Sequence, residues 1–143
     1  MSHDTDILSA EQWPAGRVLV VAATYDEREN IEPLIERVLA VDSGLQMLVV
    51  DDDSPDGTGD LALARAGGEP RLHVLVRRGR RGLGTAILEG IDLARRHGFA
   101  VAVTIDADFS HDPADIPRLL AALEPPGGKP VAVAIGSRRV PGG

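Results

Sequence analysis

The sequence has 143 residues, 43% of them hydrophobic and 26% charged, which is typical of one globular domain with a substantial core. Its net charge of −7 argues against general nucleic-acid binding, which requires a basic face, so we expect no nucleic-acid partner. The absence of cysteine excludes a disulfide framework, a thiolate nucleophile and a cysteine zinc site. No apolar run approaches the ~20 residues of a membrane span, and the N-terminus lacks the apolar core of a signal peptide.

Residues 1–16 are polar and aperiodic, and we expect an N-terminal tail that Trp13 docks onto the domain. From residue 17 onward, short apolar runs alternate with amphipathic segments. The predicted strands cover residues 17–22, 46–50, 72–76, 100–105 and 131–135, and the predicted helices cover 27–41, 58–66, 85–97 and 113–123. Because each strand is almost wholly apolar, the pattern predicts an α/β fold with a mainly parallel sheet flanked by helices on both faces. Right-handed crossovers then bring every strand-to-helix loop to one edge of the sheet, where open α/β sheets bind ligands.

Two aspartates follow the fourth predicted strand. Asp106 and Asp108 are separated only by Ala107, and two like charges this close repel each other unless a cation lies between them and another anion. Hard divalent ions such as Mg²⁺ or Mn²⁺ favour these oxygen ligands. Asp112 and Pro113 are typical of a helix N-cap and first turn, so the two carboxylates lie in a strand-to-helix loop. The alternative is ordinary turn chemistry, since aspartate initiates turns and caps helices.

The loop after the second predicted strand is also acidic. Asp51 and Asp52 follow an apolar strand, and a carboxylate there can accept hydrogen bonds from a base or from ribose hydroxyls. The alternative is turn and cap sequence, although three consecutive aspartates exceed what a cap requires.

The loop after the third predicted strand is basic, and it is rich in glycine where the next helix begins. This pattern suits either a phosphate-binding site or a solvated run of charges. Its arginines are Arg77, Arg78, Arg80 and Arg81, followed by Gly82-Leu83-Gly84.

Two more loops carry candidate residues. Tyr25 and Glu27 follow the first predicted strand and can frame a base and its ring donors. The alternative is a half-exposed aromatic ring and a first-turn glutamate that matches the helix dipole. Arg138 follows Gly136-Ser137 after the last predicted strand, either at the same edge of the sheet or as a surface arginine.

Five segments, in this order and spacing, resemble a known family: ATYDEREN, VVDDDSPDGT, GLGTA, DADFSHDP and GSRRVPGG. The sequence from residue 17 to residue 143 is similar to the family-2 inverting glycosyltransferases with the Rossmann-related GT-A fold. Within that family it most resembles the dolichyl- or polyprenyl-phosphate mannose synthases. DDDSPDGT together with DADFSHDP is specific for this subgroup, whereas Asp-x-Asp alone is not.

The resemblance implies a polyprenyl-phosphate β-D-mannosyltransferase, which moves mannose from GDP-mannose to a polyprenyl (dolichyl) phosphate with inversion at the anomeric carbon. It implies Mg²⁺ or Mn²⁺ as the cofactor, with Asp106 and Asp108 as metal ligands. It also implies that Asp108 and Arg138 are the catalytic residues and that Arg138 contacts phosphate. The implied nucleotide-sugar-binding residues are Tyr25, Glu27, Asp51, Asp52, Arg80, Asp106, Ala107, Asp108 and Arg138.

The chain departs from the family pattern at several loop positions, where Ala23 stands for proline, Arg80 for lysine and Arg81 for leucine. Family members continue well past Gly143, so we expect residues 17–143 to be the nucleotide-sugar-binding donor half, with the acceptor portion missing. The resemblance implies a cytoplasmic, peripheral protein at the cytoplasmic face of a membrane, with no transmembrane segment in this chain. It leaves open a membrane-embedded partner subunit or domain.

Three alternatives stay open. The same motifs suit a polyprenyl-phosphate glucosyltransferase that uses UDP-glucose, or a non-catalytic nucleotide-binding fragment. A phospho-acceptor receiver domain is the alternative from another class. It is disfavoured, because the first strand ends in Ala22-Ala23 instead of an aspartate pair, and because Lys129 precedes the final strand instead of following it.

Overall fold

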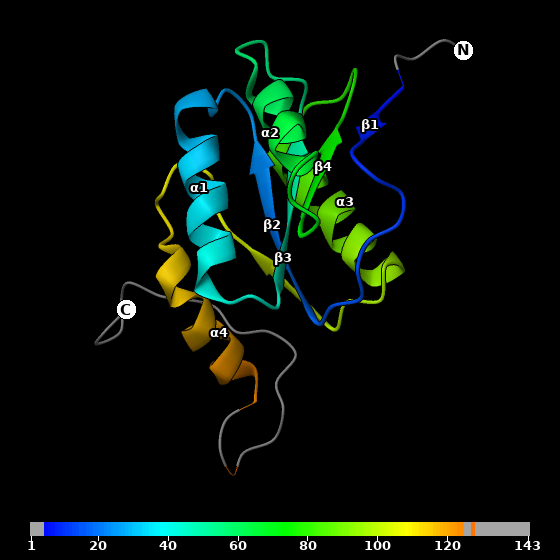
Figure 1. Ribbon diagram of the computed structural model, residues 1–143. Coiled ribbons are helices and arrows are strands. Elements are labelled where there is room, and N and C mark those ends of the chain that lie inside the picture. Colours follow the sequence, from blue (N-terminus) through cyan, green and yellow to red (C-terminus); the bar gives the residue numbers. More distant parts are fainter. Residues whose placement is uncertain (1–4, 125–126, 128–143) are drawn as a thin grey trace.

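The computed structural model describes residues 5–124 and 127, which fold around a five-stranded sheet (Figure 1). In chain order the elements are β1 (Ile7–Leu8), β2 (Val18–Thr24), α1 (Arg28–Val41), β3 (Leu45–Asp51), α2 (Thr58–Ala66), β4 (Leu72–Val76), α3 (Leu83–Arg96), β5 (Val101–Thr104), the 3-10 helix η1 (Pro113–Asp115) and α4 (Ile116–Leu123). Every element predicted within this part of the chain is present, with ends that differ by at most two residues. The strand predicted at 131–135 lies outside the described residues.

The sheet has the strand order β1-β4-β3-β2-β5, and its four long strands are parallel, which confirms the predicted mainly parallel sheet. β2 lies between β3 and β5, so that Val18 pairs with Leu45 on one side and with Val101 on the other. The four parallel strands therefore end at one edge, which we call the carboxyl edge. It is formed by the loops at residues 25–27, 52–57, 77–82 and 105–112.

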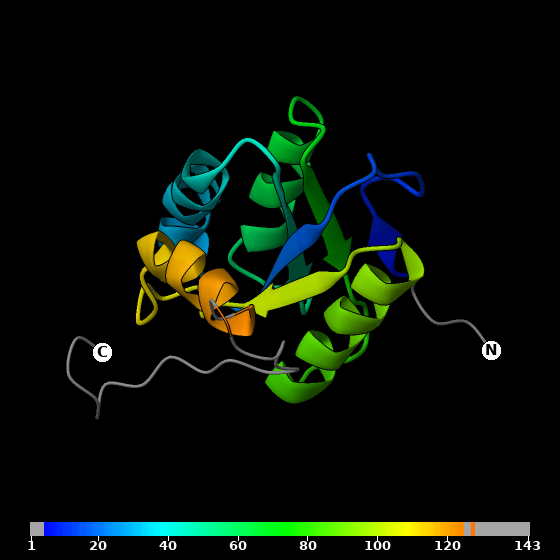
Figure 2. The same cartoon turned by 90° about the horizontal axis from the view of Figure 1, so that it is seen from below.

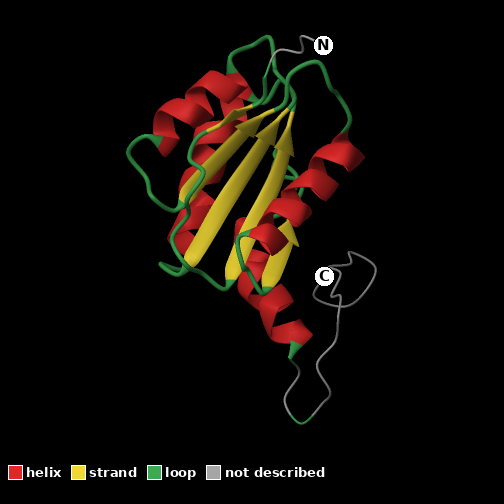
Figure 3. Ribbon diagram, turned by 90° about the vertical axis from the view of Figure 1, so that its right-hand side faces the viewer, coloured by secondary structure: helices red, strands yellow, loops and turns green. Residues whose placement is uncertain are grey.

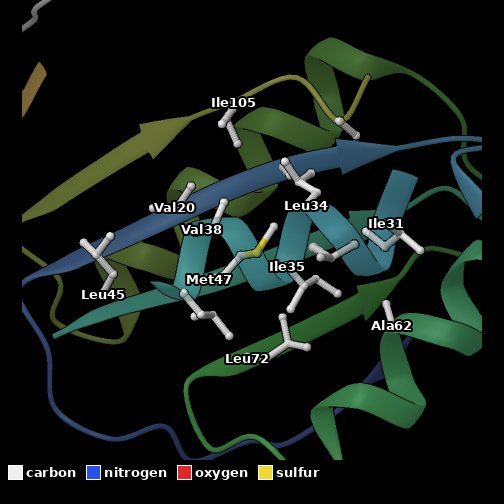
Figure 4. Close-up of a cluster of buried hydrophobic side chains, with 14 of the residues drawn as sticks. Val20, Ile31, Leu34, Ile35, Val38, Leu45, Met47, Ala62, Leu72 and Ile105 are labelled. Carbon is white, nitrogen blue, oxygen red and sulfur yellow. The ribbon is translucent and has the colours of Figure 1, made fainter. Parts of the chain in front are cut away.

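Helices cover both faces of the sheet, as predicted (Figures 2 and 3). Helices α1, α2 and α4 pack on one face, and α3 packs on the other. The alternation of side chains along a strand explains the two layers, because Val18 and Val20 belong to the cluster under α1 whereas Leu19 and Val21 belong to the cluster under α3. Figure 4 shows the larger cluster, in which the buried side chains of α1 project toward the sheet beside Met47.

The N-terminal segment differs from the predicted polar tail. Residues Ile7–Leu8 form the short strand β1, which pairs antiparallel with Val76 and Leu75 at the end of β4. A strand of two residues is too short to show a periodicity in the sequence. Its position depends instead on the unpaired edge of β4, to which it adds. The predicted docking of Trp13 is confirmed, since its ring stacks between His73 and His97 at centroid distances of 3.9 and 3.8 Å.

The buried histidine under this segment predicts a loss of stability in acid. His73 is 2% exposed, and burial, together with the nearby His97, lowers its pKa from 6.5 to about 4. The unfolded chain therefore binds a proton at His73 below pH 6.5, whereas the folded chain does so only near pH 4. The free energy of unfolding should consequently fall as the pH drops through this window, by on the order of 2 kcal/mol between neutral pH and ~4.5. Urea unfolding at the two pH values measures this loss.

A pair of histidine variants tests the assignment. His73→Gln should remove most of the pH dependence between neutral pH and ~4.5, because glutamine has no proton to gain. His111 lies on an exposed loop, so His111→Gln should leave the pH dependence of the free energy of unfolding unchanged. An equal acid-induced loss in wild type and His73→Gln would contradict the role of His73.

A close approach between α3 and the sheet predicts a second stability effect. A Cβ atom added at Gly90 would lie 2.4 Å from Cγ1 of Val21, so the helix sits too near β2 for any side chain. Gly90→Ala should therefore lower the free energy of unfolding by about 1–3 kcal/mol. Gly84→Ala on the same helix meets nothing within 4 Å and is the matched control. That variant should be neutral or stabilising by up to about 1 kcal/mol in thermal or urea unfolding, because alanine favours a helix more than glycine does.

Candidate functional site

The carboxyl edge carries the polar and strained residues that the core excludes. Three of its loops each hold one non-glycine residue in the left-handed backbone region, namely Asp26 at φ 55°, Asp53 at φ 54° and Phe109 at φ 64°. Such conformations persist only where surrounding contacts hold them, and they concentrate at functional sites. The edge thus has the preformed loop geometry of a ligand site.

Asp51 lies at the end of β3 and is fully buried, at 0% exposed. Its Oδ1 accepts hydrogen bonds from Thr24 Oγ1 at 2.6 Å and from Ser54 Oγ at 2.7 Å, and its Oδ2 accepts one from the Ser54 N–H at 2.9 Å. These donors satisfy a charge that is otherwise costly to bury, and they hold the loops after β2 and β3 together. Asp51 thus positions these loops, and its contact with a nucleoside stays a prediction.

Asp52 forms a bidentate ion pair with Arg77, which directly follows β4. Arg77 Nε lies 2.7 Å from Asp52 Oδ1, and Arg77 Nη2 lies 3.0 Å from Asp52 Oδ2. Arg77 also contacts Glu89 at 3.2 Å and donates to the Gly82 carbonyl and to Thr85 Oγ1, both at 3.1 Å. The hydrogen bonds to Asp52 are the main reason that the pKa of Arg77 is raised. The pair therefore links β3, β4 and the start of α3.

Sequence reasoning missed Arg77, because a run of arginines indicates a solvated surface. The side chain is only 2% exposed and is the largest fully buried one in the described part of the chain. The available signal was its position directly after the apolar strand β4, where a charged residue requires a buried counter-charge.

The end of β2, three carboxyl-edge loops and the start of α3 line a pocket of about 220 Å³. It is lined by Ala23, Thr24, Tyr25, Asp52, Arg81, Gly82, Leu83 and Ala86. The guanidinium carbon of Arg81 lies 3.7 Å from the centroid of the Tyr25 ring, within the range of a cation–π contact. The structure thus brings together Tyr25 and Asp52 of the predicted site and adds Arg81. A larger pocket of about 430 Å³, beside Trp13 and His73, contains none of the predicted site residues.

Two other predicted site residues have protein partners. Glu27 accepts a hydrogen bond from Asn30 Nδ2 at 2.9 Å. Arg80 is half exposed and forms ion pairs with Asp6 of the N-terminal segment and, at 3.4 Å, with Glu89 of α3. Neither residue lines the pocket beside Tyr25. Arg138 lies outside the described residues.

The aspartate pair lies in the loop after β5. Both side chains reach solvent, whereas Ala107 between them is 5% exposed. Asp106 Oδ2 accepts a hydrogen bond from Ser110 Oγ at 3.1 Å, and Asp108 Oδ1 accepts one from the Ser110 N–H at 2.9 Å. Hydrogen bonds from the Ser110 side chain and backbone lower the pKa of Asp108, which keeps its carboxylate ionised at neutral pH. The predicted N-cap is confirmed, because Asp112 Oδ1 accepts from the Ala114 N–H at 2.9 Å.

This donor set fits a divalent cation that a ligand helps to hold. No group of three or more histidine, aspartate or glutamate side chains with metal-binding geometry occurs among residues 5–124 and 127. Mg²⁺ characteristically binds to one or two carboxylates and takes its remaining ligands from water and substrate phosphates. Two solvent-accessible carboxyl groups on one loop match a site of this kind, which a substrate phosphate completes.

The protein is thus an α/β domain with an open, mainly parallel sheet. Its carboxyl edge combines a small pocket, an aspartate pair and a buried ion pair. The chain belongs to glycosyl transferase family 2, whose sequence profile matches residues 19–143. Its fold is of the GT-A type, in agreement with the prediction, because it superimposes on a mannosyltransferase from Pyrobaculum calidifontis solved with GDP-Man and Mn²⁺. The TM-score is 0.52 and the identity is 31%, over 64% of this chain and 27% of that one.

Two further relatives are similar to most of the chain. It is 47% identical over 131 residues to the polyprenol monophosphomannose synthase of Mycolicibacterium smegmatis, which covers 91% of this chain and 48% of that protein. It is 44% identical over 127 residues to the undecaprenyl-phosphate mannosyltransferase of Micrococcus luteus, which covers 89% of this chain and 50% of that protein. The chain therefore spans about half the length of these relatives.

Proposed function

We propose that this chain forms the donor-binding half of a polyprenyl-phosphate mannosyltransferase, which transfers mannose from GDP-mannose to a polyprenyl phosphate with inversion. The observation that carries the proposal is the solvent-accessible pair Asp106 and Asp108 at the carboxyl edge that also holds the Tyr25 pocket. The names of the relatives and the GDP-Man in the similar solved structure support this choice of donor and acceptor. Residues 17–143 are the proposed domain, and residues 1–16 precede it.

The transfer is a single displacement. An oxygen of the acceptor phosphate attacks the anomeric carbon of mannose from the face opposite GDP, the new C–O bond forms, and the bond to GDP breaks with its electron pair leaving on the β-phosphate. The acceptor oxygen is already ionised, so the step requires no strong general base. A divalent cation, when bound, neutralises charge on the departing diphosphate.

The residues of this chain hold the donor in place for that step. Asp106 and Asp108 are the proposed ligands of Mg²⁺ or Mn²⁺, and Tyr25 and Asp52 form the proposed nucleoside pocket. Arg138 is proposed to contact phosphate, on the basis of the Gly-Ser-Arg motif. A preorganised cation and arginine at a developing negative charge are the usual way in which proteins stabilise a leaving phosphate.

The acceptor places the proposed enzyme at a lipid surface. No helix within residues 5–124 is long and apolar enough to cross a membrane. We propose that the chain works as a peripheral protein on the cytoplasmic face of a membrane, with a membrane-embedded partner subunit or domain. Sedimentation with vesicles that contain polyprenyl phosphate tests this association.

Calorimetric titration of the 143-residue chain tests the donor. GDP-mannose should bind in the presence of Mn²⁺ and lose this binding when EDTA removes the metal, whereas UDP-glucose should bind weakly. Metal-dependent binding of UDP-glucose in place of GDP-mannose would replace the proposal by the glucosyltransferase alternative. Failure of both donors to bind would contradict the donor-half proposal.

A further inference from the structure

Arg81 has a different environment from the two neighbouring arginines with ion pairs. Arg77 pairs with Asp52 and Glu89, and Arg80 pairs with Asp6 and Glu89. Within residues 5–124 and 127, no carboxylate lies within ion-pair distance of Arg81, whose exposed side chain instead lies on the Tyr25 ring. Its guanidinium lies over the Tyr25 ring and lines the 220 Å³ pocket, and its hydrogen-bond donors are not paired with an acidic side chain of the described residues.

The charged groups that line the pocket are Arg81 and the Asp52 carboxylate. Its Oδ2 accepts two hydrogen bonds, from Arg77 Nη2 and from the Gly82 N–H, whereas its Oδ1 accepts one, from Arg77 Nε. A carboxylate oxygen can accept two hydrogen bonds, so Oδ1 has the capacity for one more beyond that from Arg77.

The rest of the lining is largely apolar and aromatic, from Ala23, Tyr25, Leu83 and Ala86. A flat aromatic ring suits such a pocket better than a diphosphate does, because phosphates require several cations and N–H donors. A ligand that meets both polar groups needs an acceptor for Arg81 and a donor for Asp52. Guanine and uracil each present a carbonyl oxygen beside a ring N–H, whereas adenine and cytosine present an amino donor where the carbonyl would be.

We propose that Arg81 is a base-specificity residue, whose guanidinium, which lies over the Tyr25 ring, donates to the carbonyl of a guanine or uracil base in this pocket. The proposal deepens the donor site and rests on the proposed function, because it requires the nucleoside of the sugar donor to enter this pocket. Arginine makes its strongest specific base contact with the O6 and N7 acceptors of guanine. Arg81 would therefore distinguish GDP from ADP.

Affinities for GDP, IDP and ADP in the presence of Mn²⁺ test this role in wild type, Arg81→Leu and Arg81→Lys. Inosine keeps O6, N7 and the ring N–H of guanine, so IDP should behave like GDP toward Arg81. Arg81→Leu should weaken GDP and IDP about tenfold and leave ADP nearly unchanged. Arg81→Lys keeps the charge without the planar fork and should also reduce the ratio of GDP to ADP affinity. Arg95→Leu, an exposed variant at the far end of α3, is the matched control and should alter none of the three affinities.

The outcomes separate this inference from the proposed function. Equal weakening of GDP and ADP in Arg81→Leu would overturn it, because Arg81 would then act on the phosphates that both ligands share. Unchanged GDP affinity would overturn it as well, while leaving the proposed donor intact. Binding of UDP in place of GDP, with Arg81→Leu weakening UDP but not CDP, would support the inference and overturn the mannose donor. Binding of no nucleotide would overturn both.

The single tyrosine gives an independent measurement. Tyr25 is the single tyrosine of the sequence, so incorporation of 3-fluorotyrosine yields one ¹⁹F resonance. Arg81→Leu should shift this resonance in the free protein, because it removes the cation from the ring. Saturating GDP should shift it in wild type. A resonance that stays fixed while calorimetry detects GDP binding would place the base elsewhere and overturn the inference alone.

Discussion

Replacing Asp108 or Asp106 by asparagine is expected to abolish metal-dependent binding of the nucleotide-sugar donor. Each variant removes one charge from a two-carboxylate site, and the amide cannot restore it. Second-shell partners that only orient a metal ligand already contribute 10- to 100-fold to metal affinity, so removal of a ligand itself should weaken Mn²⁺-dependent GDP binding by at least about a hundredfold. Calorimetry with Mn²⁺, and Mn²⁺ titration followed by electron paramagnetic resonance, measure the two affinities separately.

The control for this experiment lies in the next helical turn. Asp115 is exposed and pairs with Arg118 at 3.5 Å, so Asp115→Asn changes the net charge by the same amount at a neighbouring place. It should retain Mn²⁺ binding within about twofold, since surface ion pairs contribute little. Unchanged Mn²⁺ and GDP affinity in both Asp106→Asn and Asp108→Asn would refute the assignment of the metal site.

Replacing Arg77 by methionine is expected to destabilise the fold more than the loss of any exposed ion pair. The substitution keeps the apolar stem but leaves Asp52, which is 7% exposed, buried without its counter-charge. Removal of one partner from a buried ion pair lowers the free energy of unfolding by about 3–5 kcal/mol. Urea unfolding at neutral pH measures the difference between the variant and the wild type.

Two further variants separate the ion pair from general damage. Arg95→Ala removes an exposed arginine that pairs with Asp92 and should stay within about 0.5 kcal/mol of wild type. The double variant Arg77→Met/Asp52→Leu removes the orphaned charge and should recover a large part of the lost stability. A double variant as unstable as the sum of its two single variants would show that the two residues do not act as a pair.

The parallel sheet was predictable because three of its strands, β2, β3 and β4, are buried on both faces. Continuous apolar runs such as residues 47–50 are typical of such strands, and the amphipathic segments between them are long enough for crossover helices. β1 was not predictable, since its two residues add to an edge that exists only after β4 has folded.

The candidate site was predictable in its location but not in the division of roles. The loops carrying Asp52, Tyr25 and Asp108 follow parallel strands and therefore meet at one edge. Asp51 and Arg77 show what sequence analysis could not supply, because the burial of a charge depends on which donor faces it across the sheet. Asp51 thereby joins two loops, and Arg77 joins a strand to a helix. Arg81 differs from Arg77 and Arg80 in its contact with the Tyr25 ring and in having no ion pair among the described residues.

The central position of β2 also determines the order in which the chain can assemble during synthesis. β3 follows β2 closely, so this pair can form early, but the partner on the other side of β2 is β5, beginning at Val101. Until the ribosome has released that strand, the backbone groups of residues 18–21 on this side stay unpaired next to an apolar surface. Exposed strand edges of this kind pair with other chains. We therefore expect the nascent chain to be most prone to pairing with other chains between the synthesis of β4 and that of β5.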